Sequence, residues 1–78
     1  MSDPIALFAD MTGTAAQFYV EEGNRVEKGE TVLDIECMKS FFPVSAPVGG
    51  IVRYKVSLGD FVNQGDLVAT IESGDGKP

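Results

Sequence analysis

Histidine is absent from this sequence of 78 residues, and cysteine occurs once, as Cys37. Without histidine the chain lacks the commonest general base, a phosphohistidine carrier, the base of Ser–His and Cys–His nucleophile pairs, and the most frequent zinc ligand. One cysteine excludes an internal disulfide, which suits a reducing compartment. The sequence therefore argues against an enzyme that works with its own side chains.

Positive charge and long apolar segments are also scarce. Six Lys and Arg residues stand against twelve Asp and Glu residues, giving a formal net charge of −6, which argues against nucleic acid or an anionic membrane as the main partner. The longest apolar run is Ile5–Ala9, far shorter than the ~20 residues of a membrane-spanning helix. Residues 1–4 lack the basic and apolar regions of a signal peptide. We expect a cytoplasmic protein or a piece of one.

The length limits the chain to one domain with a small core, because a domain of this size buries only about 60% of the surface that its unfolded form exposes. Hydrophobic residues make up 44% of the chain, together with nine glycines and four prolines. This composition is typical of a globular, turn-rich domain. We expect a module that serves other proteins, with no catalytic activity of its own.

What the sequence does contain is an internal repeat, in which residues 20–36 return as residues 56–72. The identical pairs are Val20/Val56, Gly23/Gly59, Val26/Val62, Gly29/Gly65, Val32/Val68, Ile35/Ile71 and Glu36/Glu72. Upstream, Gly13 matches either Gly49, or Gly50 with a slip of one residue that also aligns Ala9 with Ala46. Such self-similarity indicates two quasi-equivalent structural halves.

Each repeat has the pattern of short strands joined by glycine turns. In the second copy Val52, Tyr54 and Val56 alternate with polar residues, the period of a half-buried strand. We expect Ala16, Phe18 and Val20 to take the matching places in the first copy. Each strand ends at a glycine, which adopts positive φ at little steric cost. No helical period is present, so we predict an all-β fold of about eight short strands.

The segment between the repeats predicts a β-hairpin with its tip at or near Met38-Lys39, because strand-like residues flank this pair on both sides. The pair is not a favourable tight turn, since neither Asn-Gly nor Asp-Gly is present. We infer that function sets the sequence at this point. A two-fold repeat places the hairpin at one end of the molecule and both termini near the other.

These residues resemble a known family. The segment contains Glu36-Cys37-Met38-Lys39, then Phe42-Pro43-Val44, Ala46-Pro47 and Gly50. It resembles the biotin-attachment domain of biotin-dependent carboxylases and decarboxylases, whose usual pattern is Glu-x-Met-Lys-Met followed by Ala-Pro and a glycine. The resemblance implies a flattened β-barrel, or barrel-sandwich hybrid, of two four-stranded antiparallel sheets with pseudo-two-fold symmetry. It covers the chain from about Ile5 to Glu72.

The resemblance also implies a site and a set of partners. Lys39 is the position that carries biotin in amide linkage, and Met38 and Ser40 flank it as residues that the ligase recognises. Ser40 stands where the family usually has methionine. The implied partners are a biotin protein ligase, a biotin carboxylase and a carboxyltransferase. We expect a monomeric carrier domain of residues 5–73. We expect residues 1–4 and 74–78, which are short and polar, to be flexible tails.

Two other functions fit the same fold. A lipoyl carrier domain of a 2-oxo acid dehydrogenase-type complex usually has Asp before the modified lysine, so Met38 favours biotin. An unmodified barrel-sandwich interaction module needs no exposed Met-Lys pair. We expect Cys37 to be a small buried or half-buried strand residue and not a redox thiol. We expect Asp34, Glu36 and Glu72 to be solvated side chains that do not form a metal cluster.

Overall fold

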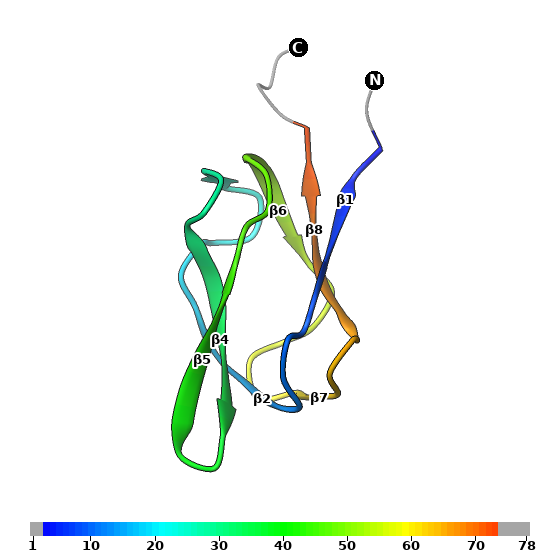
Figure 1. Ribbon diagram of the computed structural model, residues 1–78. Helices are drawn as coiled ribbons and strands as arrows, with labels where there is room; N and C mark the ends of the chain where they lie inside the picture. Colours follow the sequence, from blue (N-terminus) through cyan, green and yellow to red (C-terminus); the bar gives the residue numbers. More distant parts are fainter. Residues whose placement is uncertain (1–2, 74–78) are drawn as a thin grey trace.

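The chain folds entirely into strands and turns in the computed structural model, which describes residues 3–73 (Figure 1). The strands are β1 (Ile5–Phe8), β2 (Gly13–Phe18), β3 (Arg25–Val26), β4 (Thr31–Cys37), β5 (Ser40–Ser45), β6 (Gly50–Tyr54), β7 (Phe61–Val62) and β8 (Leu67–Glu72). The predicted eight-stranded all-β fold is therefore confirmed. Within residues 3–73 no helix is long and apolar enough to cross a bilayer.

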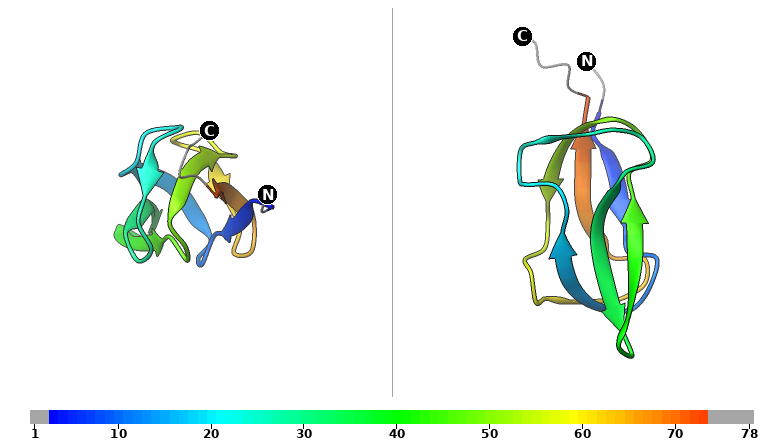
Figure 2. Two further views of the ribbon diagram at one scale, coloured as in Figure 1. Left: turned by 90° about the horizontal axis from the view of Figure 1, so that it is seen from above. Right: turned by 90° about the vertical axis from the view of Figure 1, so that its left-hand side faces the viewer.

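The strands form two four-stranded antiparallel sheets, ordered β1-β8-β6-β3 and β5-β4-β2-β7. The sheets face each other without joining into a closed barrel (Figure 2). Their inner faces supply one core of small and branched apolar side chains: Leu7, Ala9, Ala15, Val26, Val32, Leu33, Ile35, Val44, Ala46, Val52, Val62, Val68, Ala69 and Ile71. Neither sheet buries its apolar face alone, so the two halves stabilise each other.

The internal repeat is a real pseudo-two-fold symmetry of the backbone. The amide of Ala9 donates to the carbonyl of Asp66 at 2.8 Å, and the equivalent amide of Ala46 donates to the carbonyl of Glu30 at 2.8 Å. Phe18 and Tyr54, which occupy equivalent positions, stack with ring centroids 3.8 Å apart and planes 4° apart. The two halves are therefore joined by a contact between equivalent residues.

The slip of one residue in the repeat is a β-bulge at Ala16. Along β4, Ala15 pairs with Ile35 and Gln17 with Asp34, so Ala16 has no partner of its own; β6 pairs with β8 without such a skip. Ala15, not Ala16, is therefore buried in the place equivalent to Val52, and the expectation for Ala16 was wrong. The bulge inserts an extra residue into one strand only, which sequence alternation alone does not reveal.

The long axis of the molecule separates the β4–β5 hairpin from the start of β1 and the end of β8 (Figure 1). The molecule measures 42 × 19 × 18 Å along its principal axes. Ile5 pairs with Ile71, so the chain enters and leaves the domain side by side, at the end opposite the hairpin. Of the tails expected at 1–4 and 74–78, residues 1–2 and 74–78 lie outside the described residues.

Candidate functional site

The β4–β5 hairpin positions the candidate site. Leu33 and Ile35 of β4 are fully buried in the core, which anchors one strand of the hairpin. Cross-strand pairs then run outward from Leu33/Val44 to a last pair, Cys37/Ser40. Only two residues remain to connect the strands, so the turn is of the shortest kind.

Those two residues are Met38 and Lys39, and both adopt positive φ, at 54° and 67°. Two positive φ angles are what a two-residue type I′ turn requires, a conformation that suits Asn-Gly and costs other L-residues about 1–2 kcal/mol each. Local stability therefore does not explain this pair of residues. Strain of this kind at an exposed turn points to a functional constraint on the sequence.

The structure brings the three predicted site residues together at the tip. Met38 is 90% exposed, and Lys39 and Ser40 are also exposed. Among residues 3–73 the ammonium group of Lys39 has neither an ion pair nor a hydrogen bond. Cys37 is half-buried at the end of β4, as predicted. The geometry offers an unobstructed primary amine on a strand pair that is anchored in the core.

The base of the hairpin is held by a close backbone approach. A methyl group at Gly13 of β2 would overlap the carbonyl oxygen of Glu36, three residues before Lys39. Thr14 pairs with Glu36 on the adjoining strand. The glycine therefore lets β2 lie close against β4 where the hairpin leaves the body of the domain. This support fits a tip that must be presented at a fixed place.

Asp34 of β4 corrects one sequence expectation, because its side chain is only 7% exposed and not solvated. The hydroxyl of Tyr19 donates to Oδ2 of Asp34 at 2.5 Å and covers the carboxylate. This hydrogen bond, with burial and the charge of Asp34, raises the pKa of Tyr19 above its usual value of 10.0. Both side chains line a shallow groove that extends to Phe41 of β5.

Sequence reasoning missed a row of residues on the outer face of the sheet β5-β4-β2-β7. Phe41 pairs with Glu36, Glu36 with Thr14, and Thr14 with Phe61, so the four side chains share this face. Phe41 is 57% exposed and Phe61 is 67% exposed. Phe61 is distant from Lys39 in sequence. The only sequence feature that pointed to its exposure was its place next to Val62, because neighbouring residues of a strand face opposite sides of the sheet.

Comparison with known proteins identifies the family of the chain. Residues 7–71 match the biotin/lipoyl family, described as "Biotin-requiring enzyme". A biotinylated protein homolog of Mycobacterium leprae is 39% identical over 64 residues, which cover 81% of this chain and 90% of that protein. The chain thus spans nearly the whole of one relative.

Solved structures show the same fold inside a larger protein and as a separate domain. The Kluyveromyces lactis urea carboxylase has a TM-score of 0.83 and 36% identity, over 92% of this chain and 6% of the carboxylase. The lipoyl domain of the 2-oxoglutarate dehydrogenase complex of Azotobacter vinelandii has a TM-score of 0.69 and 26% identity, over 88% of this chain and 99% of that domain. The family match covers most of the chain, and the chain therefore belongs to the biotin/lipoyl attachment family as a carrier domain for covalently bound biotin.

Proposed function

We propose that this chain is the biotin carboxyl carrier of a biotin-dependent carboxylase or decarboxylase, with biotin attached to Nζ of Lys39. The observation that carries the proposal is the unobstructed amine of Lys39 at the apex of a two-residue hairpin turn. The likeness to a urea carboxylase supports the choice of carboxylases as the class of system served. When bound, biotin supplies a ureido nitrogen that accepts and releases a carboxyl group.

The attachment step needs an activated biotin, because nothing in residues 3–73 contacts the amine of Lys39 to assist it. We propose that a biotin protein ligase supplies biotinyl-adenylate, made from biotin and ATP. Nζ of Lys39 attacks its carbonyl carbon, and the amide bond forms as the bond from that carbon to the phosphate oxygen breaks. AMP leaves with the electron pair, and the amine gives its proton to the ligase or to water.

The proposed working partners are a biotin carboxylase, which uses bicarbonate and MgATP, and a carboxyltransferase. Because the carried group is tethered to the domain, its local concentration at each partner's site is roughly millimolar. The core-anchored strands behind Lys39 limit the entropy lost each time the tip docks. The chain itself contributes reach and recognition, and we assign it no catalytic residue.

We also propose residues 5–73 as the carrier domain, acting as a monomer in the cytoplasm. β1 begins at Ile5 and β8 ends at Glu72, which supports these limits. Each sheet covers the inner face of the other within a single chain, so the core needs no second copy. The cytoplasm supplies the MgATP on which the proposed ligase and carboxylase depend.

The deciding experiment combines the chain with biotin protein ligase, biotin and ATP, followed by intact-mass measurement and streptavidin capture. We expect the mass of one added biotinyl group in the wild type and none in Lys39→Arg, which keeps the charge but removes the amine nucleophile. Capture of Lys39→Arg would show that another lysine carries the group. In a parallel mixture with lipoate ligase, lipoic acid and ATP, lipoylation of a wild type that accepts no biotin would favour a lipoyl carrier.

A further inference from the structure

We propose that Phe61 and Leu58 extend the ligase-binding surface beyond the hairpin, so that the enzyme that attaches biotin docks on the outer face of the sheet β5-β4-β2-β7. This inference rests on the proposed attachment at Lys39 and adds a specific contact to it. Phe61 lies on β7 and Leu58 in the turn that precedes β7, far from the lysine in sequence. Both side chains are largely exposed, Phe61 at 67% and Leu58 at 56%.

The internal repeat provides a control for this surface. Phe61 and Arg25 occupy equivalent positions, since each pairs with the second residue of a neighbouring strand, Thr14 or Ile51. Leu58 is equivalent to Glu22, one residue before the matched turn glycine in each copy. Because the backbone geometry is shared, the fold accepts a charged side chain at both positions. Folding therefore does not explain the apolar residues beside the hairpin.

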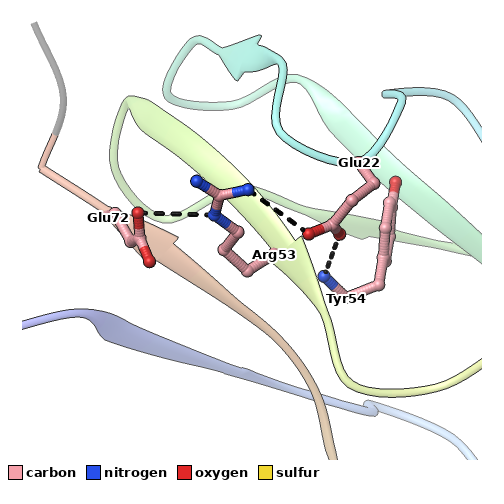
Figure 3. Close-up of polar contacts among 4 residues, drawn as sticks. All are labelled: Glu22, Arg53, Tyr54 and Glu72. Carbon is pink, nitrogen blue, oxygen red and sulfur yellow. Dashed lines mark hydrogen bonds and ion pairs between the residues drawn. The ribbon is translucent and has the colours of Figure 1, made fainter. Parts of the chain in front are cut away.

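The other copy shows what these positions do when they carry charge. Arg53 lies between two carboxylates, with Nε 3.4 Å from Glu72 and Nη1 3.5 Å from Glu22 (Figure 3). Glu22 also accepts a hydrogen bond from the amide of Tyr54 at 2.8 Å. Arg25 forms an ion pair with Glu27 at 3.1 Å. That end of the molecule thus has a solvated, ionic outer surface.

At the hairpin end two charged residues of the other copy, Glu22 and Arg25, have the apolar equivalents Leu58 and Phe61. The residue equivalent to Arg53 is Gln17, and the residue equivalent to Glu22 is Leu58, so no ion pair of this kind can form. Phe61 and Phe41 lie at the two edges of the sheet in one cross-strand row. Exposed apolar groups gathered beside a functional tip are typical of a protein-docking surface.

The position of the row favours the ligase as its occupant. Phe41 is two residues behind Lys39, or about 7 Å along the strand, and the row crosses three strand spacings, or about 14 Å. Nζ of lysine extends only about 6 Å from its Cα. An enzyme that must receive this amine in its active site therefore comes within contact distance of Phe41, and an interface of the usual size, about 800 Å² per partner, extends across the rest of the row. Enzymes that act on the far end of the attached biotin can remain farther away.

The test measures ligase kinetics with the unmodified chain as the varied substrate. We expect Phe61→Arg and Leu58→Glu, which copy the other half of the repeat, to raise KM at least tenfold and to change kcat less than twofold. Phe61→Ala, which removes the apolar ring without adding charge, should also raise KM. Phe8→Ser is the matched control, since Phe8 is exposed on the other sheet and its repeat equivalent is Ser45; its KM should change less than twofold.

Each outcome separates this inference from the proposed function. Normal biotinylation kinetics in Phe61→Arg, with the wild type biotinylated, would overturn the docking surface and leave the proposed function intact. An equal rise of KM in Phe8→Ser would overturn it too, because the effect would then be general. Normal ligase kinetics with impaired carboxylation would assign the surface to the carboxylase instead. A wild type that accepts no biotin would overturn both proposals. Unchanged circular dichroism and thermal midpoint will establish that each variant is folded.

Discussion

Two adjacent glycines, Gly49 and Gly50, illustrate how much the fold depends on single atoms. A methyl group at Gly50 would overlap the carbonyl oxygen of Glu72 and approach Ile71, and the backbone there has φ of 155°. A methyl group at Gly49 would meet its nearest neighbours, the guanidinium of Arg25 and the carbonyl oxygen of Val26, only at 3.4 Å. Gly50, not Gly49, is therefore the equivalent of Gly13, which resolves the two alignments that the sequence allowed.

This contrast predicts different costs for the same substitution. Gly50→Ala should lower the free energy of unfolding by about 2–3 kcal/mol, through overlap and an unfavourable backbone angle. Gly49→Ala should change it by less than about 1 kcal/mol. Urea denaturation of the two variants measures the difference. Equal losses would mean that the backbones of β6 and β8 separate easily at this point.

Met38 and Ser40 flank Lys39 but differ in what they offer a partner. Met38 presents an almost wholly exposed apolar side chain, whereas Ser40 is a small polar residue paired with Cys37. Met38→Asp should therefore reduce kcat/KM for ligation at least about tenfold, since it replaces the exposed apolar side chain beside Lys39 by a carboxylate. Ser40→Met, which restores the usual family residue, should change kcat/KM less than about threefold. The reverse ranking would show that the ligase reads the second flank of the lysine.

The hairpin was predictable as an element, but its backbone conformation was not. Flanking strand patterns placed the tip at Met38-Lys39, and the resemblance singled out the lysine. The sequence could not show that both residues adopt positive φ, because turn preferences argue against it. The bulge at Ala16 was likewise hidden, since an unpartnered residue leaves no mark on an apolar alternation. The burial of Asp34 was missed because it depends on Tyr19, which is 15 residues away in sequence and comes close only in the folded chain.

The strained turn predicts a conflict between stability and attachment. Replacing Met38 by Asn together with Lys39 by Gly should raise the free energy of unfolding by about 1 kcal/mol, because Asn-Gly suits a type I′ turn. The double variant should accept no biotin. Lys39→Arg separates the two effects, since it should lose attachment with its stability unchanged to within about 0.5 kcal/mol. A double variant less stable than the wild type would refute the assignment of strain to this turn.

The two sheets as a whole keep the hairpin apart from the place where β1 begins and β8 ends. Figure 1 shows the tip at one end of a 42 Å axis and the start of β1 and end of β8 at the other. The pseudo-two-fold repeat made this arrangement predictable from the sequence alone. The difference between the ionic outer surface around Arg53 and the exposed apolar residues Leu58 and Phe61 was not predictable. The structure first had to show which side chains at equivalent positions are exposed.

The separation of the two ends predicts tolerance to attached domains. Fusing a globular protein to either terminus should change kcat/KM for ligation less than about twofold, because the fused mass lies far from Lys39. The same protein inserted in the turn of residues 57–60, at the hairpin end, should lower kcat/KM substantially by blocking the outer face. Ligation assays on the purified fusions compare the two placements. Similar losses in all fusions would contradict this polarity.

The pairing of Ile5 with Ile71 determines how the domain responds to mechanical force. Tension applied through its two ends pulls β1 away from β8 at adjacent points, so the hydrogen bonds between them carry the load one after another. Strands loaded in this way separate at low force, because only one hydrogen bond at a time resists the pull. β1 is also an outer strand with only β8 beside it. The β4–β5 hairpin lies on the other sheet, outside the path of this force. Tension applied at the two ends of the domain would therefore detach β1 from β8 before it disturbed the β4–β5 hairpin.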